Sequence, residues 1–219
     1  MAIPAVLHVA SMSQALPVGA VLARRGRLRP APVVWVAAWC VVLLLSDAGL
    51  LLIARWEGNN LWVRYIALPA ESTLALWTLS YWQVHDLLRL AYRLAIPLLL
   101  VATALTLAFS DSSRHFDEFM APLHALVLLT AALHTLVHRA IRTEGSITRE
   151  SWFWVSLGMS LYFGSAVALQ PFNSALLATH MDWVRAAYLT HAWVEIVAFA
   201  LITVGVLCPP YQGPFGGRS

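Results

Sequence analysis

The sequence predicts an all-α membrane protein with seven transmembrane helices, and three observations lead to this fold class. Hydrophobic residues make up 60% of the 219-residue chain and charged residues only 11%, which is too little charge to cover the surface of a soluble domain. Apolar stretches long enough to cross a hydrocarbon core of about 30 Å recur along the chain. The connections between these stretches are short, so no separate soluble domain is expected.

The seven predicted spans follow one another closely and form a single domain over residues 1–208. His8, Gln14 and two prolines lower the hydropathy of the first span. It does not resemble a signal peptide, because no basic residue precedes its apolar run. The tail at 209–219 begins with two adjacent prolines and is expected to be a short disordered cytoplasmic segment. The predicted spans are residues 3–23, 32–54, 61–82, 90–109, 119–138, 151–170 and 184–207.

Arginine supplies all 14 basic residues, and its distribution predicts the orientation of the spans. Ten arginines fall on one side of the predicted membrane, and Arg55, Arg64, Arg114 and Arg185 fall on the other. Because positive residues concentrate in cytoplasmic loops, the N-terminus is predicted outside and the C-terminus in the cytoplasm. We therefore expect a multi-pass protein of the cell membrane, whose arginines lie beside anionic lipid and do not bind nucleic acid.

A three-residue motif that occurs twice suggests that the chain contains a parallel repeat. Trp62-Val63-Arg64 opens the third span and Trp183-Val184-Arg185 opens the seventh, and a glutamate follows each near the predicted midplane. These positions are equivalent if spans one to three repeat as spans five to seven, with the fourth span as a linker. This 3+1+3 arrangement predicts a site at the interface between the two triplets.

Three acidic residues, Asp47, Glu71 and Glu195, fall inside predicted spans. Ionisable groups near the bilayer centre cost on the order of 2.5–3.5 kcal/mol each on the insertion scale, and they usually face the protein interior or water. Pro69 removes a backbone donor two residues before Glu71, which frees a carbonyl oxygen for another partner. The acids are therefore candidates for ligand binding or proton transfer, and the alternative is that they only bond neighbouring helices together.

Polar neighbours extend these acids into a candidate site. Arg64 and Glu71 are two helical turns apart, about 10.5 Å, so we expect Arg64 to bind another helix or to extend toward the outer interface. Tyr188, His191 and Glu195 form a polar stripe on the last span, in which a His191–Glu195 pair would fix the histidine tautomer and accept a proton. The predicted ligand and proton site comprises Gln14, Asp47, Arg64, Glu71, Tyr188, His191 and Glu195.

Histidines offer an alternative haem site. His124 and His138 lie about four turns apart on nearly one face of the fifth span, and membrane cytochromes that stack two haems use histidines at such spacing. His191 and His85 are the candidate second ligands. No second span carries a matching histidine pair, so the sequence predicts no cofactor and no metal site.

The stretch SDAGLLLIARWEGNNLWVRYIALPAES resembles the membrane-embedded lycopene cyclases of the heterodimeric or fused type. That family has an aspartate in one helix and a Pro-x-Glu-Glu/Asp motif in the next, matched here by Asp47 and by Pro69-Ala70-Glu71. Ser72 stands in place of the second acid, and the second triplet has no Pro-x-Glu. The resemblance covers about a tenth of the chain and implies that Glu71 protonates a polyene without a soluble cofactor.

No motif names a ligand, so the sequence predicts function only by class. We expect a protein that binds or transports a small molecule or ion at a mid-membrane polar site, with protonatable Glu and His groups, as a transporter or as the membrane module of a sensor. The alternatives are an intramembrane enzyme acting on a lipid or polyene, a b-type haem protein, and an accessory subunit of a membrane complex. Whether the protein is an enzyme therefore stays open.

Partners are predicted with equal breadth. The lipid bilayer and a small molecule or ion are expected, and a membrane-protein partner or a homo-oligomer is compatible with the sequence. A retinal pigment is excluded, because the chain has no lysine to form the Schiff base.

Overall fold

The computed structural model describes residues 5–23, 31–56, 62–109, 113–175 and 181–208 of the chain, apart from the side chains at 54–56, 113–118, 170–175 and 181. The predicted tail at 209–219 and several of the arginines behind the predicted orientation lie outside these residues. The elements are α1 (Ala5–Ser13), α2 (Ala15–Ala23), α3 (Ala31–Trp56), α4 (Trp62–Ser80), α5 (Asp86–Phe109), α6 (Ser113–Ala140), η1 (Ile147–Arg149), α7 (Ser151–Ala175) and α8 (Met181–Leu207).

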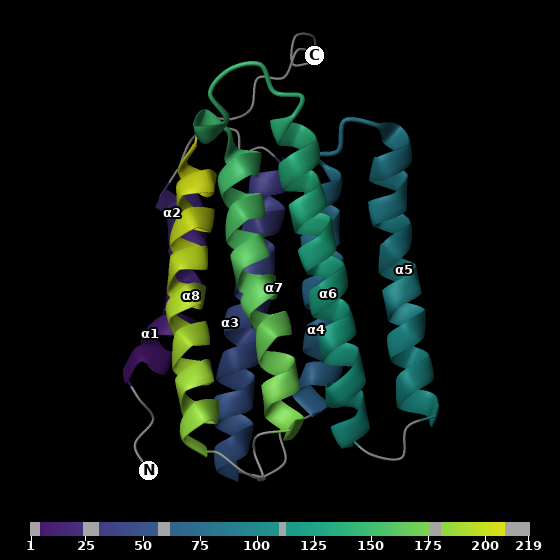
Figure 1. Ribbon diagram of the computed structural model, residues 1–219, viewed down its shortest axis with the longest axis vertical. Coiled ribbons are helices and arrows are strands. Elements are labelled where there is room, and N and C mark those ends of the chain that lie inside the picture. The colour runs from purple at the N-terminus through teal and green to yellow at the C-terminus, as the bar shows by residue number, and fades with distance from the viewer. Residues whose placement is uncertain (1–4, 24–30, 57–61, 110–112, 176–180, 209–219) are drawn as a thin grey trace.

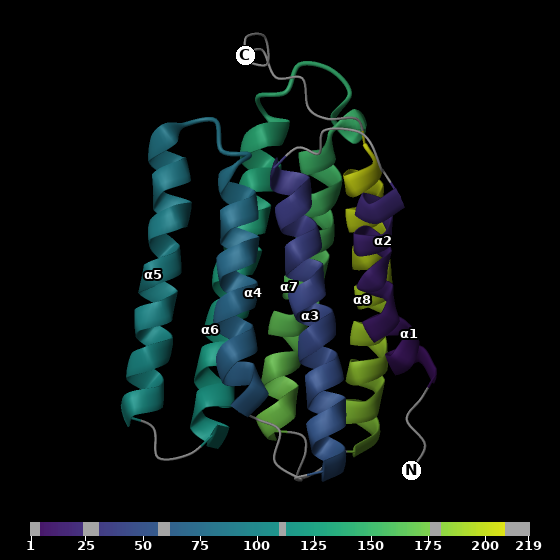
Figure 2. The ribbon, with the colours of Figure 1, turned by 180° about the vertical axis from the view of Figure 1, so that it is seen from behind.

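The fold is an all-helical bundle, and the described ranges contain no strand. Helices α3 to α8 run side by side, with α5 at one edge (Figures 1 and 2). Among the residues that the structure describes, six segments are long and apolar enough to cross a membrane: Ala5–Ala23, Ala31–Ile53, Asp86–Phe109, Phe119–Ala140, Ser151–Leu169 and Asp182–Leu207. The prediction of a multi-pass, all-α membrane protein is supported at this level.

Helix α4 is the predicted span that is not among these six apolar segments. It lies within the bundle beside α3 and α5 (Figure 2), but Arg64, Glu71 and four serine and threonine residues lower its hydropathy. Its place as a seventh span stays a prediction, as do the orientation and the 3+1+3 repeat. The two Trp-Val-Arg motifs differ in their surroundings, because Arg185 is exposed at the start of α8 whereas Arg64 lines a cavity.

The first predicted span is two helices that meet at Gln14. Pro17 has no backbone N–H, so it cannot bond the carbonyl of Ser13 one turn before it. In addition, the Ser13 hydroxyl donates a hydrogen bond to the Ala10 carbonyl at 2.6 Å. Hydroxyl bonds of this kind to the preceding helical turn also bend helices. The break therefore follows from local sequence, and it places Gln14 in the interior with 2% of its surface exposed.

Aromatic packing connects α3 to α7 and α8. Trp39 is fully buried, and its ring centroid lies 5.8 Å from those of Tyr162 and Phe163 and 5.9 Å from that of Phe199. Contacts at these separations add to the burial of apolar surface. The three helices thereby form one firmly packed unit of the bundle.

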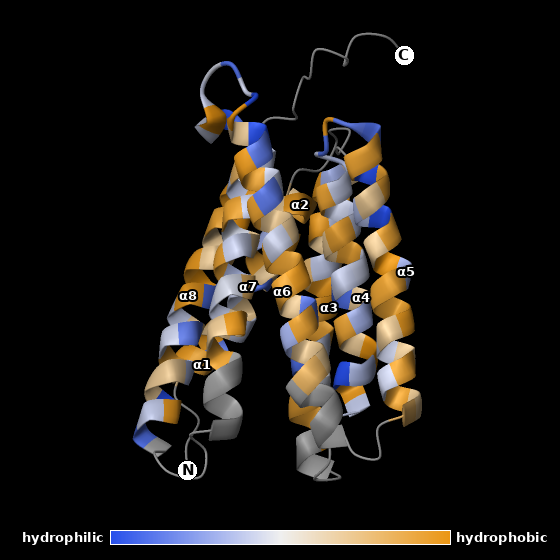
Figure 3. Cartoon of the chain, turned by 45° about the vertical axis from the view of Figure 1, so that its right-hand side comes forward, coloured by the Kyte–Doolittle hydropathy of each residue, from blue (hydrophilic) through white to orange (hydrophobic). Residues whose placement is uncertain are grey.

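Helices α7 and α8 approach closely because glycines lie at their interface. A Cβ atom at Gly158 would be 2.6 Å from the Ala198 carbonyl oxygen, and one at Gly205 would be 2.8 Å from Val155 Cγ2. Small residues allow such close backbone approach in membrane bundles. Figure 3 shows α7 and α8 diverging from α4 and α6 toward the end of the bundle away from the C-terminus.

Candidate functional site

A cavity of about 210 Å³ lies among α3, α4, α6, α7 and α8. Its residues fall in the half of the bundle nearest the α3–α4 and α7–α8 connections, toward which Figure 3 shows the helices diverging. Five of the seven predicted site residues line it: Asp47, Arg64, Glu71, Tyr188 and His191. The remaining lining residues are Leu43, Ser46, Leu50, Ala67, Leu68, Ser72, Ala121, His124, Ala125, Leu128, Tyr162, Phe163, Ala166 and Leu169.

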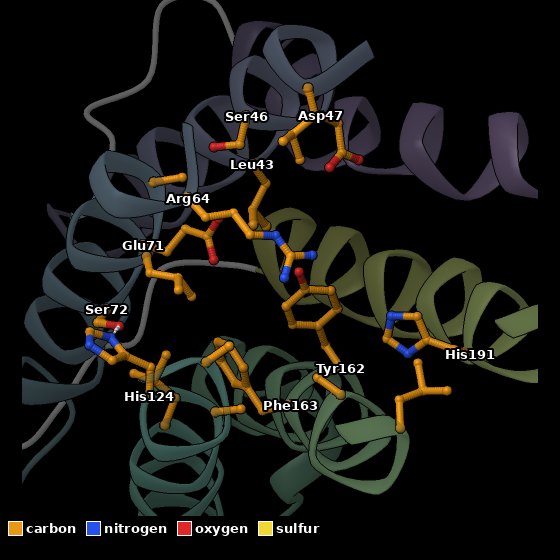
Figure 4. Close-up of a pocket in the computed structure, with 18 of the residues that line it drawn as sticks. Leu43, Ser46, Asp47, Arg64, Glu71, Ser72, His124, Tyr162, Phe163 and His191 are labelled. Atoms are coloured by element: carbon orange, nitrogen blue, oxygen red, sulfur yellow. Dashed lines mark hydrogen bonds between the residues drawn. The ribbon is translucent and has the colours of Figure 1, made fainter. Parts of the chain in front are cut away.

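Arg64 brings a positive charge into the cavity. It is the third residue of α4, and its side chain runs inward past Glu71 toward Tyr162 (Figure 4). The side chain thus lies among the cavity residues, and its position relative to the outer interface stays a prediction. Glu71 interacts electrostatically with Arg64, which attracts its carboxylate, and with Asp47, which repels it. The cavity thus combines two carboxyl groups with one guanidinium group.

Gln14 lies behind the cavity wall and joins the other two predicted acids. Its Nε2 donates to Asp47 Oδ2 at 3.0 Å and to Glu195 Oε1 at 2.7 Å. Glu195 is buried, with 9% of its surface exposed. We call these three residues the Gln14 cluster. Asp47 belongs both to this cluster and to the cavity lining, so the two polar regions meet at one side chain.

The predicted pair between His191 and Glu195 is not formed. His191 Nδ1 lies 2.9 Å from Ser165 Oγ on α7, whereas Glu195 accepts a hydrogen bond from Gln14. No hydrogen bond joins the two residues in the described part of the chain. Positions four apart share a helix face, but each of these side chains finds its partner on a different neighbouring element.

His124 is held on both sides by hydroxyl groups. Its Nδ1 lies 2.5 Å from Ser72 Oγ and its Nε2 lies 3.0 Å from Thr103 Oγ1, and the first of these contacts is drawn in Figure 4. The side chain has no exposed surface. A haem iron would have to displace one of these bonds, so the geometry does not favour His124 as a haem ligand.

A second group of polar side chains occupies the other half of the bundle. The ring centroids of His85 and His138 lie 5.8 Å apart, and those of His138 and His134 lie 5.2 Å apart. Arg142 contacts Nε2 of His85. The Tyr92 hydroxyl lies 2.8 Å from His134 Nδ1, which links α5 to α6. The described residues contain no group of three or more His, Cys, Asp or Glu side chains arranged to hold a metal ion.

Sequence reasoning missed the uncharged part of the cavity. Tyr162 and Phe163 place aromatic rings in its lining, and Tyr162 interacts electrostatically with Asp47, Arg64 and Glu71. Ser165, the partner of His191, was missed as well. The signal available was the run SLYFGS, in which two aromatic residues stand between serines, but this pattern is common in apolar helices and does not by itself indicate a site.

No protein-family model, curated protein or solved structure matched this chain. The cavity and the Gln14 cluster are therefore the observations from which function is inferred.

Proposed function

We propose that this protein binds a small polar molecule or ion in the cavity and transports it across the membrane in a proton-linked manner. The observation that carries the proposal is the convergence of three ionisable side chains, Asp47, Arg64 and Glu71, from two helices on one cavity. A membrane module of a sensor would use the same binding site, with the conformational change read by a partner protein.

The arrangement differs from that of polar groups that only hold helices together. His124 closes its hydrogen bonds with Ser72 and Thr103, and such bonds stabilise membrane bundles modestly. Asp47, Arg64 and Glu71 place three ionisable side chains around a space of about 210 Å³, which Ser72 and His124 also line. Ionisable side chains at membrane depth are expensive and usually mark ligand or ion pathways. A binding role accounts for their position around a cavity, which a purely structural role does not.

The lining indicates the class of ligand. Pockets for drug-sized ligands span roughly 300–1,000 Å³, and this cavity of about 210 Å³ suits a smaller solute. The guanidinium of Arg64 favours a carboxylate or a similar planar anionic group, and the carboxyl groups of Asp47 and Glu71 favour an amine or hydroxyl donor. A small zwitterion meets both requirements. The charged lining does not favour a polyene, so we do not propose the cyclase chemistry that the resemblance implies.

The break in the first span supports transport over static binding. Secondary transporters commonly bind substrates and ions beside helices that are interrupted near the midplane. Here the interruption at Gln14 lies within the 19-residue segment Ala5–Ala23, and it contacts the cavity through Asp47.

Solute-driven proton movement tests this function directly. The full-length protein is reconstituted in vesicles that contain a pH-sensitive dye, and amino acids, other zwitterions, carboxylates, amines and inorganic ions are added one at a time. We expect one class of solutes to change the internal pH. Glu71→Gln should abolish the response, because it removes a cavity carboxyl group.

Glu144→Gln serves as the matched control, because Glu144 is exposed in the connection between α6 and η1 and its replacement should leave the response intact. A response that survives Glu71→Gln, or the absence of any response across the panel, would contradict proton-linked transport through the cavity.

A further inference from the structure

We propose that the Gln14 cluster is a binding site for a single proton, distinct from the solute cavity and connected to it through Asp47. The role of this proton in coupling rests on the proposed function, and the site identifies where the coupling proton is held. Three elements build this site, namely the α1–α2 junction with Gln14, α3 with Asp47 and α8 with Glu195.

One amide nitrogen donates hydrogen bonds to two carboxyl groups. Nε2 of Gln14 carries two hydrogen atoms, and it lies 3.0 Å from Asp47 Oδ2 and 2.7 Å from Glu195 Oε1. The amide therefore donates one hydrogen to each carboxyl group, and these two oxygens stay within two hydrogen-bond lengths of each other. Two full negative charges this close repel each other. A single bound proton removes one of them.

The amide oxygen of Gln14 points to the same conclusion independently. Gln14 is 2% exposed, and its buried Oε1 has no hydrogen-bond partner. Because Nε2 is bonded to both carboxyl groups, Oε1 of the same amide lies beside them. An acceptor left without a donor in the interior is unfavourable. The site therefore lacks one donor hydrogen at this position.

Protonation of Glu195 supplies that hydrogen. A carboxyl group that gains a proton becomes an O–H donor while its other oxygen remains an acceptor. Glu195 Oε1 already accepts from Nε2, so a proton taken from water onto Oε2 forms an O–H that can donate to Gln14 Oε1. The acid and the amide then share two hydrogen bonds. When the proton leaves, it returns to water, and the Glu195 carboxylate keeps its bond from Nε2.

Other ionisable groups near the cluster set the background charge. Glu71 and Arg64 face it from α4 and Tyr162 faces it from α7, and Tyr162 interacts electrostatically with both Asp47 and Glu195. His191 lies one turn before Glu195 on α8 and bonds Ser165. On the other two elements, His8 of α1 is exposed and α2 has no ionisable residue.

Asp47 couples this site to the cavity. Its carboxyl group accepts from Gln14 and also lines the space proposed for the solute. A proton on the cluster changes the charge that Asp47 and its neighbours present to that space. Proton binding and solute binding therefore influence each other, and the influence is reciprocal.

Infrared spectroscopy of the full-length protein in lipid tests the site without any solute. Protonated carboxyl groups give a carbonyl stretching band that is absent from carboxylates and moves to lower wavenumber when the carbonyl accepts a hydrogen bond. We expect such a band to appear as the pH falls. Glu195→Gln should reduce it by half or more. Asp47→Asn should make it appear only at lower pH, because the neighbouring negative charge is removed, and Gln14→Met, which is similar in size, should move it to higher wavenumber.

Glu144→Gln is the matched control and should leave this band unchanged, because Glu144 is exposed in the connection between α6 and η1. Selective labelling of glutamate with ¹³C in the carboxyl group should shift the band in the unmutated protein, which separates a glutamate from Asp47 as the protonated group without relying on a variant that folds. Three outcomes would overturn the proposal: a band lost only in Glu71→Gln, a band that Gln14→Met leaves in place, or a band that changes when Na⁺ replaces K⁺. Because no solute is present, failure of the proposed transport function leaves this result unaffected.

Discussion

The side-chain amide of Gln14 and the carboxyl group of Glu195 lie 2.7 Å apart although 181 positions separate them in the sequence. The bond connects the break in the first predicted span to the middle of the last helix. Through Asp47, 3.0 Å from the same nitrogen, the contact extends to the wall of the cavity. The first and last helical segments are thus joined at the polar site.

Removal of the Gln14 amide should destabilise the bundle. Gln14→Met retains the side-chain volume but removes the amide donor to buried Glu195 and to partly buried Asp47, and the loss of a buried partner costs about 1–3 kcal/mol. Thermal or denaturant unfolding in detergent measures this change. Thr190→Ala is the control, because Thr190 is exposed and its hydroxyl donates to the Ala186 carbonyl of its own helix, and its replacement should change stability by no more than about 0.5 kcal/mol. Equal stability of Gln14→Met and the unmodified protein would contradict this account of the cluster.

A methyl group at Gly158 should weaken the packing of α7 on α8. The added Cβ in Gly158→Ala would meet the backbone oxygen of Ala198 at 2.6 Å, which cannot move aside as a side chain can, and overpacking typically costs about 1–3 kcal/mol. In Gly164→Ala the nearest atom, Leu129 Cδ1, is 3.7 Å away, so this variant should melt like the unmodified protein. Similar melting temperatures for both variants would show that the helices do not approach as closely as described.

An aromatic side chain at position 166 should block the cavity without changing its charges. Ala166 lines the cavity on α7, and Ala166→Phe fills part of a space of about 210 Å³. We expect the variant to insert and fold but to lose the solute-driven proton movement in vesicles. Ala104→Phe is the control, since Ala104 is exposed on α5 and its replacement adds the same group outside the cavity. An intact response in Ala166→Phe would place the solute elsewhere.

The purified protein should show no Soret band. Both ring nitrogens of His124 already contact hydroxyl groups, and His191 contacts Ser165, so the two histidines predicted to hold an outer haem are committed to other partners. An absorption spectrum from 300 to 700 nm checks this. A Soret band that disappears in His124→Ala, but remains in a size-matched surface variant such as His8→Ala, would restore the haem alternative.

Much of the helical framework could be predicted from the sequence, because the bilayer demands long apolar segments. The predicted spans correspond to the helical segments within a few residues at most ends, although α6 begins at Ser113, earlier than the predicted start at 119. The break at Gln14 was not predicted. Its local cause, Pro17 together with Ser13, was visible, but an intact helix with a tolerated proline fits the same pattern.

The site could be predicted only in part. An acid inside an apolar span stands out in the sequence, and Asp47 and Glu71 do line one cavity, with Glu195 joined to Asp47 through Gln14. Which partner each side chain selects depends on how neighbouring helices are rotated, and no pattern within one helix determines that. His191 therefore bonds Ser165 where Glu195 was expected. Tyr162 was missed because an aromatic residue in an apolar helix carries no distinguishing signal.

Solute binding to the purified protein tests the central claim most directly. The thermal stability of the unmodified protein, Glu71→Gln and Glu144→Gln is measured against a panel of small zwitterions, carboxylates, amines and inorganic ions. A solute at 100 times its dissociation constant stabilises the folded state by about 2.7 kcal/mol. We predict that at least one zwitterion raises the melting temperature of the unmodified protein and of Glu144→Gln but not that of Glu71→Gln. Stabilisation that Glu71→Gln retains in full, or a panel in which no solute stabilises the unmodified protein, would contradict a solute site in this cavity.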